Sequence, residues 1–317
     1  MQSVQVHTIP TQDQQPQPYP DSIERAVGPL QAQEPVQPGP FSELATFCPI
    51  GVFDSGMGGL SIVAEIRKLL PHEDIIYYGD NSNCPYGGRS DEWLRARSLE
   101  ITDFLLERGA KAIVVACNTA SAAGLEHLRA LRKAPIVGLV PAVKPAVALS
   151  SSRTVGVLAT QATMRGRLLA DVIKQFATPA NVEAVTVAPA GLVEAVERGD
   201  LDTPATLQTV SEAIQPMLDR GADAIVLGCT HYPFLKPLIQ QIAGPDVHLI
   251  DSGEGVARQT YRLLEARHLL RQSNHKGTLT VYTSADPDLM RPIVWRLVGE
   301  EVPVLSASIH AEESHEW

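Results

Sequence analysis

Two cysteines, Cys117 and Cys229, occupy matching positions in an internal repeat. Residues 109–119 (GAKAIVVACNT) align with residues 221–231 (GADAIVLGCTH), and six of the eleven positions are identical, including the cysteines. Each cysteine follows an apolar run that predicts a buried strand and precedes a stretch that predicts a helix. The repeat therefore predicts two similar lobes, each with one thiol at the carboxyl end of its sheet, where ligands bind in open parallel sheets.

Two opposed thiols suit a reaction that inverts a stereocentre by proton exchange. One thiolate removes the α-hydrogen on one face of a substrate, and the opposite thiol delivers a proton to the other face. A cysteine thiol has a reference pKa of about 8.5, and the following helix N-terminus is expected to favour its thiolate. Three alternatives remain open, namely two inert buried cysteines, a Cys117–Cys229 disulfide and a two-ligand metal site.

Small and polar residues surround the expected strand ends. Residues 54–59 (DSGMGG) follow the first strand and resemble an anion-binding loop, although a Gly-rich tight turn is the alternative. Asp54 is expected to orient a substrate ammonium or a thiol, and His231 to serve Cys229 as a proton partner. Residues 85–88 (PYGG) follow the second strand, at the same rim of the sheet. Because Arg and Lys are scarce in these loops, we expect backbone amides, hydroxyls and helix ends to recognise an anionic substrate.

The pattern from Pro49 onward predicts an α/β fold, because short apolar runs alternate with helical stretches. We expect two pseudo-symmetric α/β lobes with mostly parallel sheets that face each other across a cleft. The boundaries are a Pro/Gln-rich flexible tail at 1–47, a first lobe at 48–143, a second lobe at 144–250 and a C-terminal segment at 251–317 that returns to the first lobe. The tail is expected because nine of the chain's 24 prolines fall before residue 50.

The expected elements have the following bounds. Strands are predicted at 50–53, 75–78, 112–116, 136–140, 154–158, 182–187, 224–227, 247–250 and 279–283. Helices are predicted at 60–70, 91–107, 120–131, 163–176, 192–198, 204–220 and 235–242, and from 251–253 to about residue 270.

Composition narrows the class of protein. The formal net charge of −10 argues against a nucleic-acid partner, since such binders usually carry a basic stripe. No run approaches the roughly 18 apolar residues of a membrane span, and a secretory signal pattern is absent, so we expect a cytoplasmic protein without a membrane partner. The four cysteines lie far apart, which argues against a zinc ribbon or a disulfide scaffold.

Several motifs together resemble those of the glutamate racemases, in the aspartate/glutamate racemase superfamily. The resemblance runs from about Pro49 to beyond residues 251–253 (DSG), and the motifs are FDSG at 53–56, PYG at 85–87, ACNTAS at 116–121, GLVP at 138–141 and LGCTHYP at 227–233. It implies a cofactor-independent isomerase without a metal, which supplies D-glutamate for peptidoglycan. It also implies that Cys117 deprotonates D-glutamate and Cys229 deprotonates L-glutamate. Substrate contacts are implied at Asp54, Ser55, Tyr86, Gly87, Asn118, Thr119, Thr230 and His231.

Three points stay open within this resemblance. The family uses a glutamate in the second lobe, for which Glu197 is slightly favoured over Glu194. The N-terminal extension resembles that of members that respond to a UDP-sugar peptidoglycan precursor, which implies such an activator here. The oligomeric state is either monomer or homodimer.

Other functions compete with this one. A related racemase or isomerase could act on aspartate, a hydantoin or another acidic substrate. A single-cysteine hydrolase and a hinged ligand-binding module are further alternatives, but neither needs thiols at both strand ends.

Overall fold

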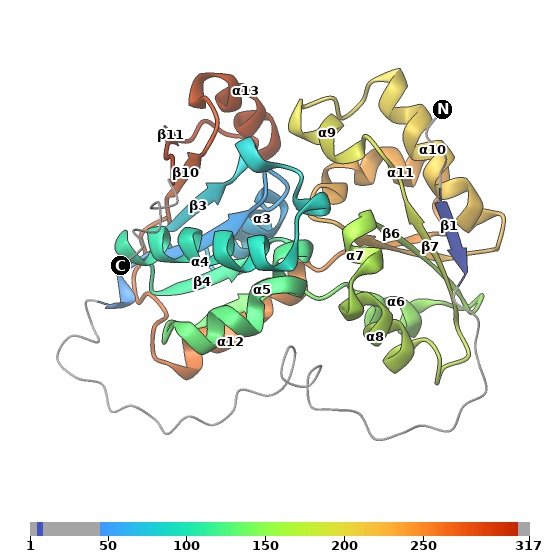
Figure 1. Ribbon diagram of the computed structural model, residues 1–317, viewed down its shortest axis with the longest axis horizontal. Helices are drawn as coiled ribbons and strands as arrows, with labels where there is room; N and C mark the ends of the chain where they lie inside the picture. The colour runs from blue at the N-terminus through green and yellow to red at the C-terminus, as the bar shows by residue number, and fades with distance from the viewer. Residues whose placement is uncertain (1–4, 9–44, 310–317) are drawn as a thin grey trace.

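The computed structural model describes residues 5–8 and 45–309 of the chain. They form two α/β lobes side by side, each built on its own sheet (Figure 1). The two-lobed α/β architecture predicted from the repeat is confirmed.

The first sheet has six strands in the order β11-β10-β3-β2-β4-β5, and all neighbouring strands are parallel. The strands are β2 (Ile50–Asp54), β3 (Ile75–Gly79), β4 (Ala112–Val115), β5 (Ile136–Gly138), β10 (Leu279–Thr283) and β11 (Val304–Ser306). The helices of this part of the chain are α3 (Leu60–Leu69), α4 (Asp91–Glu107), α5 (Asn118–Leu131), α12 (Gly253–Ala266) and α13 (Pro287–Val298). Two short 3-10 turns, η1 (Asn81–Asn83) and η2 (Tyr86–Gly88), follow β3.

The second sheet has the order β1-β7-β6-β8-β9, and only β1 is antiparallel to its neighbour. The strands are β1 (Gln5–Thr8), β6 (Thr154–Ala159), β7 (Glu183–Ala188), β8 (Ala224–Gly228) and β9 (His248–Ile250). The helices are α6 (Val143–Leu149), α7 (Gln161–Arg165), α8 (Arg167–Phe176), α9 (Leu192–Glu197), α10 (Pro204–Leu218) and α11 (Lys236–Ala243), with the 3-10 turn η3 (Tyr232–Leu235) before α11.

The repeat is visible in the strand order. The series β5-β4-β2-β3 in one sheet corresponds to β9-β8-β6-β7 in the other, so the two cysteine-bearing units follow equivalent strands. The strands are apolar throughout because helices cover both faces of each sheet. In β4, for example, Val114 packs into the cluster with Ile66 while Val115 packs into the cluster with Leu105 on the other face.

Two local predictions differ from the structure. The predicted helix 163–176 is broken at Gly166, whose backbone is extended (φ −69°, ψ 143°), so that α7 and α8 are separate helices. Gln5–Thr8, inside the predicted flexible tail, pair with β7 as strand β1. An edge strand offers unpaired N–H and C=O groups, and β1 uses those of β7. The rest of the tail prediction, up to residue 44, lies outside the described residues.

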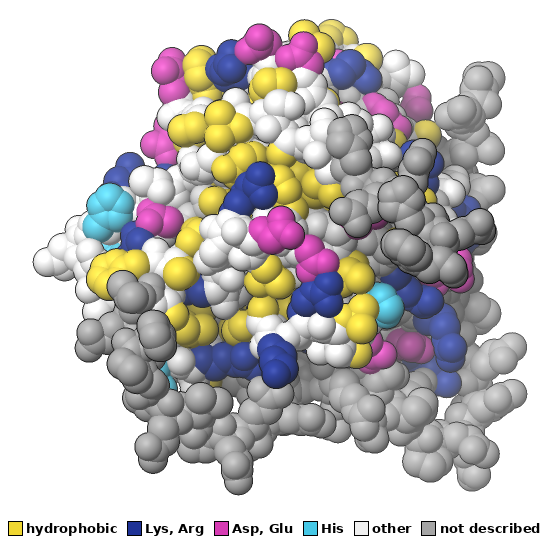
Figure 2. All heavy atoms as spheres, turned by 60° about the vertical axis from the view of Figure 1, so that its left-hand side comes forward, with side chains coloured by type: hydrophobic (Ala, Val, Ile, Leu, Met, Phe, Trp, Pro, Cys, Tyr) yellow, Lys and Arg dark blue, Asp and Glu magenta, His cyan; other side chains and the backbone are white. Residues whose placement is uncertain are grey.

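The surface of one face is mixed in character. Figure 2 shows basic, acidic and apolar side chains interspersed on it. Among the helices of the described ranges, none has the length and apolar character needed to cross a membrane.

Candidate active site

A cavity of about 390 Å³ lies at the carboxyl ends of the central strands and is lined by residues from both lobes. Both Cys117 and Cys229 line it. So do all the residues expected to contact a substrate, namely Asp54, Ser55, Tyr86, Gly87, Asn118, Thr119, Thr230 and His231. The architecture thus brings the two repeated thiols to one space, as opposed strand ends allow.

Cys117 is the residue before α5, and its side chain is only 5% exposed. Its Sγ lies 4.0 Å from Ser55 Oγ. Burial and the neighbouring Asp54 carboxylate hold the pKa of Cys117 well above its usual value, although the N–H groups of Ala120 and Ser55 oppose this. The N-terminus of α5 thus favours the thiolate through the Ala120 N–H, as expected, but desolvation and a like charge outweigh it.

Asp54 ends β2 and is completely buried. One carboxylate oxygen accepts the Ser55 N–H at 2.7 Å, and the other accepts the Gly59 N–H at 2.7 Å. The Thr230 hydroxyl of the second lobe donates to the same carboxylate at 3.1 Å. Burial raises the pKa of Asp54, against the opposing effects of His231 and of a hydrogen bond with Cys117. Asp54 is therefore placed to act on the Cys117 thiol.

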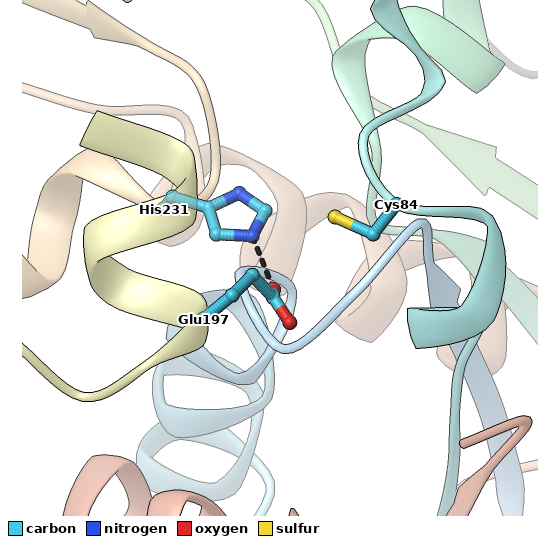
Figure 3. Close-up of side chains that lie close together, drawn as sticks. All are labelled: Cys84, Glu197 and His231. Atoms are coloured by element: carbon cyan, nitrogen blue, oxygen red, sulfur yellow. Dashed lines mark hydrogen bonds and ion pairs between the residues drawn. The ribbon is translucent and has the colours of Figure 1, made fainter. Parts of the chain in front are cut away.

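His231 lies between the second thiol and a carboxylate. Its Nδ1 lies 3.6 Å from Cys229 Sγ. Its Nε2 donates to Glu197 Oε1 at 2.6 Å (Figure 3). Burial alone would lower the pKa of His231, but hydrogen bonds with Cys229, Cys84 and Glu197 raise it well above its usual value. Burial would likewise raise the pKa of Glu197, but the His231 contact outweighs burial and lowers it. The pair is therefore an imidazolium and a carboxylate at neutral pH.

The two candidate glutamates lie in different places. Glu197 does not line the cavity; besides His231 it binds the Met57 N–H at 2.6 Å and the Asn81 amide at 2.7 Å, both in the first lobe. Glu194 lines the cavity and is exposed. Only Glu197 contacts the acid/base residues directly.

The glycine-rich loop binds anions, but they are the protein's own carboxylates. Its N–H groups donate to Asp54 and, at Met57, to Glu197. A Cβ at Gly56 would lie 2.1 Å from Glu197 Oε1, and a Cβ at Gly58 would lie 2.3 Å from His231 Nδ1. The small residues are thus needed so that the second lobe's acid/base pair can approach, which is a different reason from the predicted binding of a substrate carboxylate.

Cys84 is part of this arrangement, although the sequence showed no counterpart for it. Ligand atoms of Cys84, Glu197 and His231 lie within 4.8 Å of one another, the one such group in the described part of the chain (Figure 3). Thiolate, imidazole and carboxylate are ligands for a soft ion such as Zn²⁺, which would have to displace the protons held there. Burial raises the pKa of the Cys84 thiol to about 11, against the hydrogen bond with His231.

Tyr86 is held by a buried ion pair. Its hydroxyl donates to Asp80 at 2.7 Å, and the Arg97 guanidinium binds both Asp80 oxygens at 2.8 Å. Burial would raise the pKa of Asp80, but the Arg97 bonds and charge lower it. The Tyr86 hydroxyl is therefore engaged within the first lobe.

Sequence reasoning missed several cavity residues, among them Thr160, Thr163, Arg165 and Tyr232. The repeat could have indicated one of them. Residues 50–55 (IGVFDS) also align, more weakly, with residues 155–160 (VGVLAT), and this alignment makes Thr160 the counterpart of Ser55. Two buried polar atoms at the cavity, Asn118 Oδ1 and the Tyr232 hydroxyl, have no hydrogen-bond partner among the described residues.

Comparison with known proteins identifies the family. The model of the Asp/Glu/hydantoin racemase family matches residues 59–260. The chain belongs to this family. A glutamate racemase of Herpetosiphon aurantiacus is 52% identical over 75% of this chain and 93% of its own length. A glutamate racemase of Methylococcus capsulatus is 47% identical over 83% of this chain and 93% of its own length.

Solved structures agree with this membership. The Escherichia coli glutamate racemase in complex with L-glutamate and the activator UDP-MurNAc-Ala has a TM-score of 0.74 at 32% identity, covering 83% of this chain and all of that one (100%). The glutamate racemase of Thermus thermophilus in complex with β-chloro-D-alanine has a TM-score of 0.70 at 38% identity, covering 83% and 98% of the two chains. This family member is therefore an enzyme of the isomerase class.

Proposed function

We propose that the chain is a glutamate racemase that interconverts L- and D-glutamate by proton transfer between two thiols. The observation that carries the proposal is that Cys117 and Cys229 end equivalent strands of the two lobes and line one cavity. The relatives of 47% and 52% identity, both glutamate racemases, support this choice of substrate over aspartate or another acidic substrate.

In each direction, one thiolate accepts the α-proton of the substrate and the opposite thiol donates a proton to the α-carbon. With L-glutamate bound, the Cys229 thiolate removes the α-proton and the Cys117 thiol delivers its proton to the opposite face. The products are D-glutamate, a Cys229 thiol and a Cys117 thiolate, and the reverse reaction exchanges the roles. D-glutamate is the form used in peptidoglycan synthesis.

Different neighbours support the two thiols. The His231 imidazolium lies 3.6 Å from Cys229, within reach for a hydrogen bond to its sulfur, while Glu197 holds the charge on His231. Asp54 positions Cys117, and the negative charge of its carboxylate favours the protonated thiol there. The substrate is held by Ser55, Tyr86, Gly87, Asn118, Thr119, Thr230 and His231, and the unpartnered Asn118 Oδ1 suits an ammonium donor.

The deciding experiment follows glutamate in D₂O. The wild-type protein should exchange the α-hydrogen for deuterium while the solution loses optical activity. Cys117→Ala and Cys229→Ala should each abolish racemisation, because each direction needs both thiols. Cys48→Ala, which changes a cysteine outside the cavity, should retain activity. Loss of optical activity at the wild-type rate in either cavity variant would refute the two-thiol mechanism. Exchange with aspartate but not with glutamate would identify aspartate as the substrate.

We further propose that residues 48–143 together with 251–317 act as one unit and residues 144–250 as the other. The membership of β10 and β11 in the first sheet supports this division. Besides the segment between β1 and β2, the chain passes between the two sheets after β5 and after β9. These last two connections are short and would allow the cavity to open and close.

A UDP-sugar peptidoglycan precursor is the proposed activator. Its support is the N-terminal extension and the E. coli neighbour, whose structure contains UDP-MurNAc-Ala. The test compares the full chain with a chain lacking residues 1–44, each with and without UDP-MurNAc-Ala. Activation of the full chain alone supports a regulatory extension, and an identical response in both chains overturns it.

A further inference from the structure

Within residues 5–8 and 45–309, Arg165 is the only Lys or Arg that lines the cavity. It is the last residue of α7 in the second lobe, and its Nη2 donates to the Gly87 carbonyl of the first lobe at 3.1 Å. The predicted scarcity of Arg and Lys around the site thus has one exception, and its hydrogen bond joins the two lobes.

The break at Gly166 places Arg165 there. Thr160 caps α7 by accepting the Thr163 N–H, and the extended backbone at Gly166 ends the helix one turn later. The short helix contacts η2 and α5 of the first lobe, whereas α8 continues in another direction against α6. An uninterrupted helix from residue 163 to 176 would not present this guanidinium separately from the face that packs on the sheet.

The charge of Arg165 has no carboxylate partner in the described ranges. Its one hydrogen bond there is to a neutral carbonyl, and its side chain is exposed. Of the other charged groups lining the cavity, the Asp54 and Glu194 carboxylates repel an incoming anion, whereas the buried His231 imidazolium attracts it. A guanidinium offers five donors and binds a carboxylate through two parallel hydrogen bonds, so a carboxylate is a better partner than the Gly87 oxygen.

We propose that Arg165 is a substrate-binding residue that draws a glutamate carboxylate into the cavity, exchanging its Gly87 bond for the substrate. The inference rests on the proposed function and adds to it a residue that supplies positive charge to one of the two carboxylates of glutamate. Arg165 does not transfer protons, so its removal acts on binding and leaves the chemical step intact.

The test compares Arg165→Gln with Arg165→Lys and with Arg167→Gln, whose exposed side chain lies two residues further on and outside the cavity. Initial rates for both enantiomers are measured at low and high ionic strength, after thermal unfolding shows that each variant folds. Arg165→Gln should raise KM about tenfold at low salt with kcat within about twofold of wild type. The difference should shrink at high salt, because ions screen an exposed charge.

The two controls make the outcome decisive. Arg165→Lys should keep most of the salt dependence, and Arg167→Gln should match the wild type. A wild-type KM and salt dependence in Arg165→Gln would overturn the inference. So would equal losses of kcat in Arg165→Gln and Arg165→Lys with KM unchanged, since that pattern assigns the residue to holding the lobes together. Wild-type activity itself tests the proposed function, so the two failures are distinguishable.

Discussion

The two thiols end equivalent strands but meet different partners. Cys117 lies beside Asp54, which ends β2, whereas the corresponding end of β6 is Ala159. Cys229 instead has His231 two residues later, where the first lobe has Thr119. A symmetric backbone therefore carries an asymmetric pair of acid/base supports.

Thermodynamics limits how this asymmetry can appear. Enantiomers have equal free energies in achiral water, so the equilibrium constant is unity and kcat/KM must be equal in the two directions. Changing Asp54 or His231 will therefore alter kcat/KM equally for both enantiomers. Only kcat and KM taken separately can differ between directions, and these are the quantities in which the two supports are distinguishable.

Replacing Glu197 by Gln should decide between the two glutamates. The His231 imidazolium loses its carboxylate partner, so its pKa falls toward or below its usual value and Cys229 loses a charged donor as pH rises. We expect kcat/KM to fall at least about tenfold at neutral pH and the alkaline limb of the pH–rate profile to move to lower pH.

Glu194→Gln is the matched comparison, because its side chain is exposed and does not contact His231. It should cost much less activity and leave the pH profile in place. If Glu194→Gln instead showed the larger loss and the shifted profile, the supporting carboxylate would be Glu194.

At the scale of elements, the loop between β3 and α4 depends on one ion pair. Arg97, on α4, binds Asp80 at the end of β3, and Asp80 in turn binds the Tyr86 hydroxyl. Arg97→Met should lower the free energy of unfolding by about 3–5 kcal/mol, because it leaves a buried carboxylate unpaired. Urea denaturation measures this loss. Adding Asp80→Asn should recover part of it, and a double variant no more stable than the single one would contradict the pairing argument.

Before each of the two repeated strands, a charged side chain at the same position of the repeat binds a neighbouring segment and anchors the strand. This side chain is positive in the first lobe and negative in the second. Lys111, before β4, binds Glu73 at 2.5 Å and the Thr46 carbonyl at 2.7 Å. Asp223, before β8, accepts the Ser151 and Ser152 N–H groups, both at 2.7 Å. The two copies of the repeat thus have their anchoring residue at the same position but with opposite charge.

The Asp223 anchor predicts a pH-dependent stability. Although burial opposes the shift, hydrogen bonds from Ser150, Ser151 and Ser152 lower the pKa of Asp223 to about 2. Because this folded pKa lies below the unfolded value, the contribution is present above about pH 4 and is lost as the pH falls toward 2. Asp223→Asn should therefore lower Tm at pH 7, and its difference from wild type should shrink on acidification. The exposed Asp246, changed to Asn, is the control, and a gap that stayed constant with pH would contradict this account.

Local patterns predicted the elements better than they predicted the site. The helix 91–107 has the bounds expected from its pattern, and the eight strands expected between residues 50 and 250 all form. The break at Gly166 was missed because the helical pattern continues through it. The Cys84 position and the Glu197–Met57 bond depend on the approach of distant segments, which no local spacing encodes. The repeat did predict that the two thiols end equivalent strands, because similar sequence units fold alike and so relate positions that are far apart in the chain.

On the scale of the whole molecule, several hydrogen bonds that join the lobes are made by cavity residues. The Thr230 hydroxyl binds Asp54, the Ser61 hydroxyl binds the Thr230 carbonyl, and Arg165 binds Gly87. Opening the lobes to admit a substrate would break these bonds, and closing them would restore the contacts of Asp54. The hydrogen bonds that position the acid/base residues would therefore form and break together with the closing and opening of the lobes.

The contact of Gly56 with Glu197 has a consequence for how such sequences can diverge. Any side chain at position 56 would collide with the carboxylate of the other lobe, since even a Cβ would lie 2.1 Å from its Oε1. A mutation there is tolerable only alongside a shorter or repositioned side chain at 197. Substitutions at positions 56 and 197 are therefore expected to occur together. A substitution that disrupts activity at one position should select for a compensating substitution at the other.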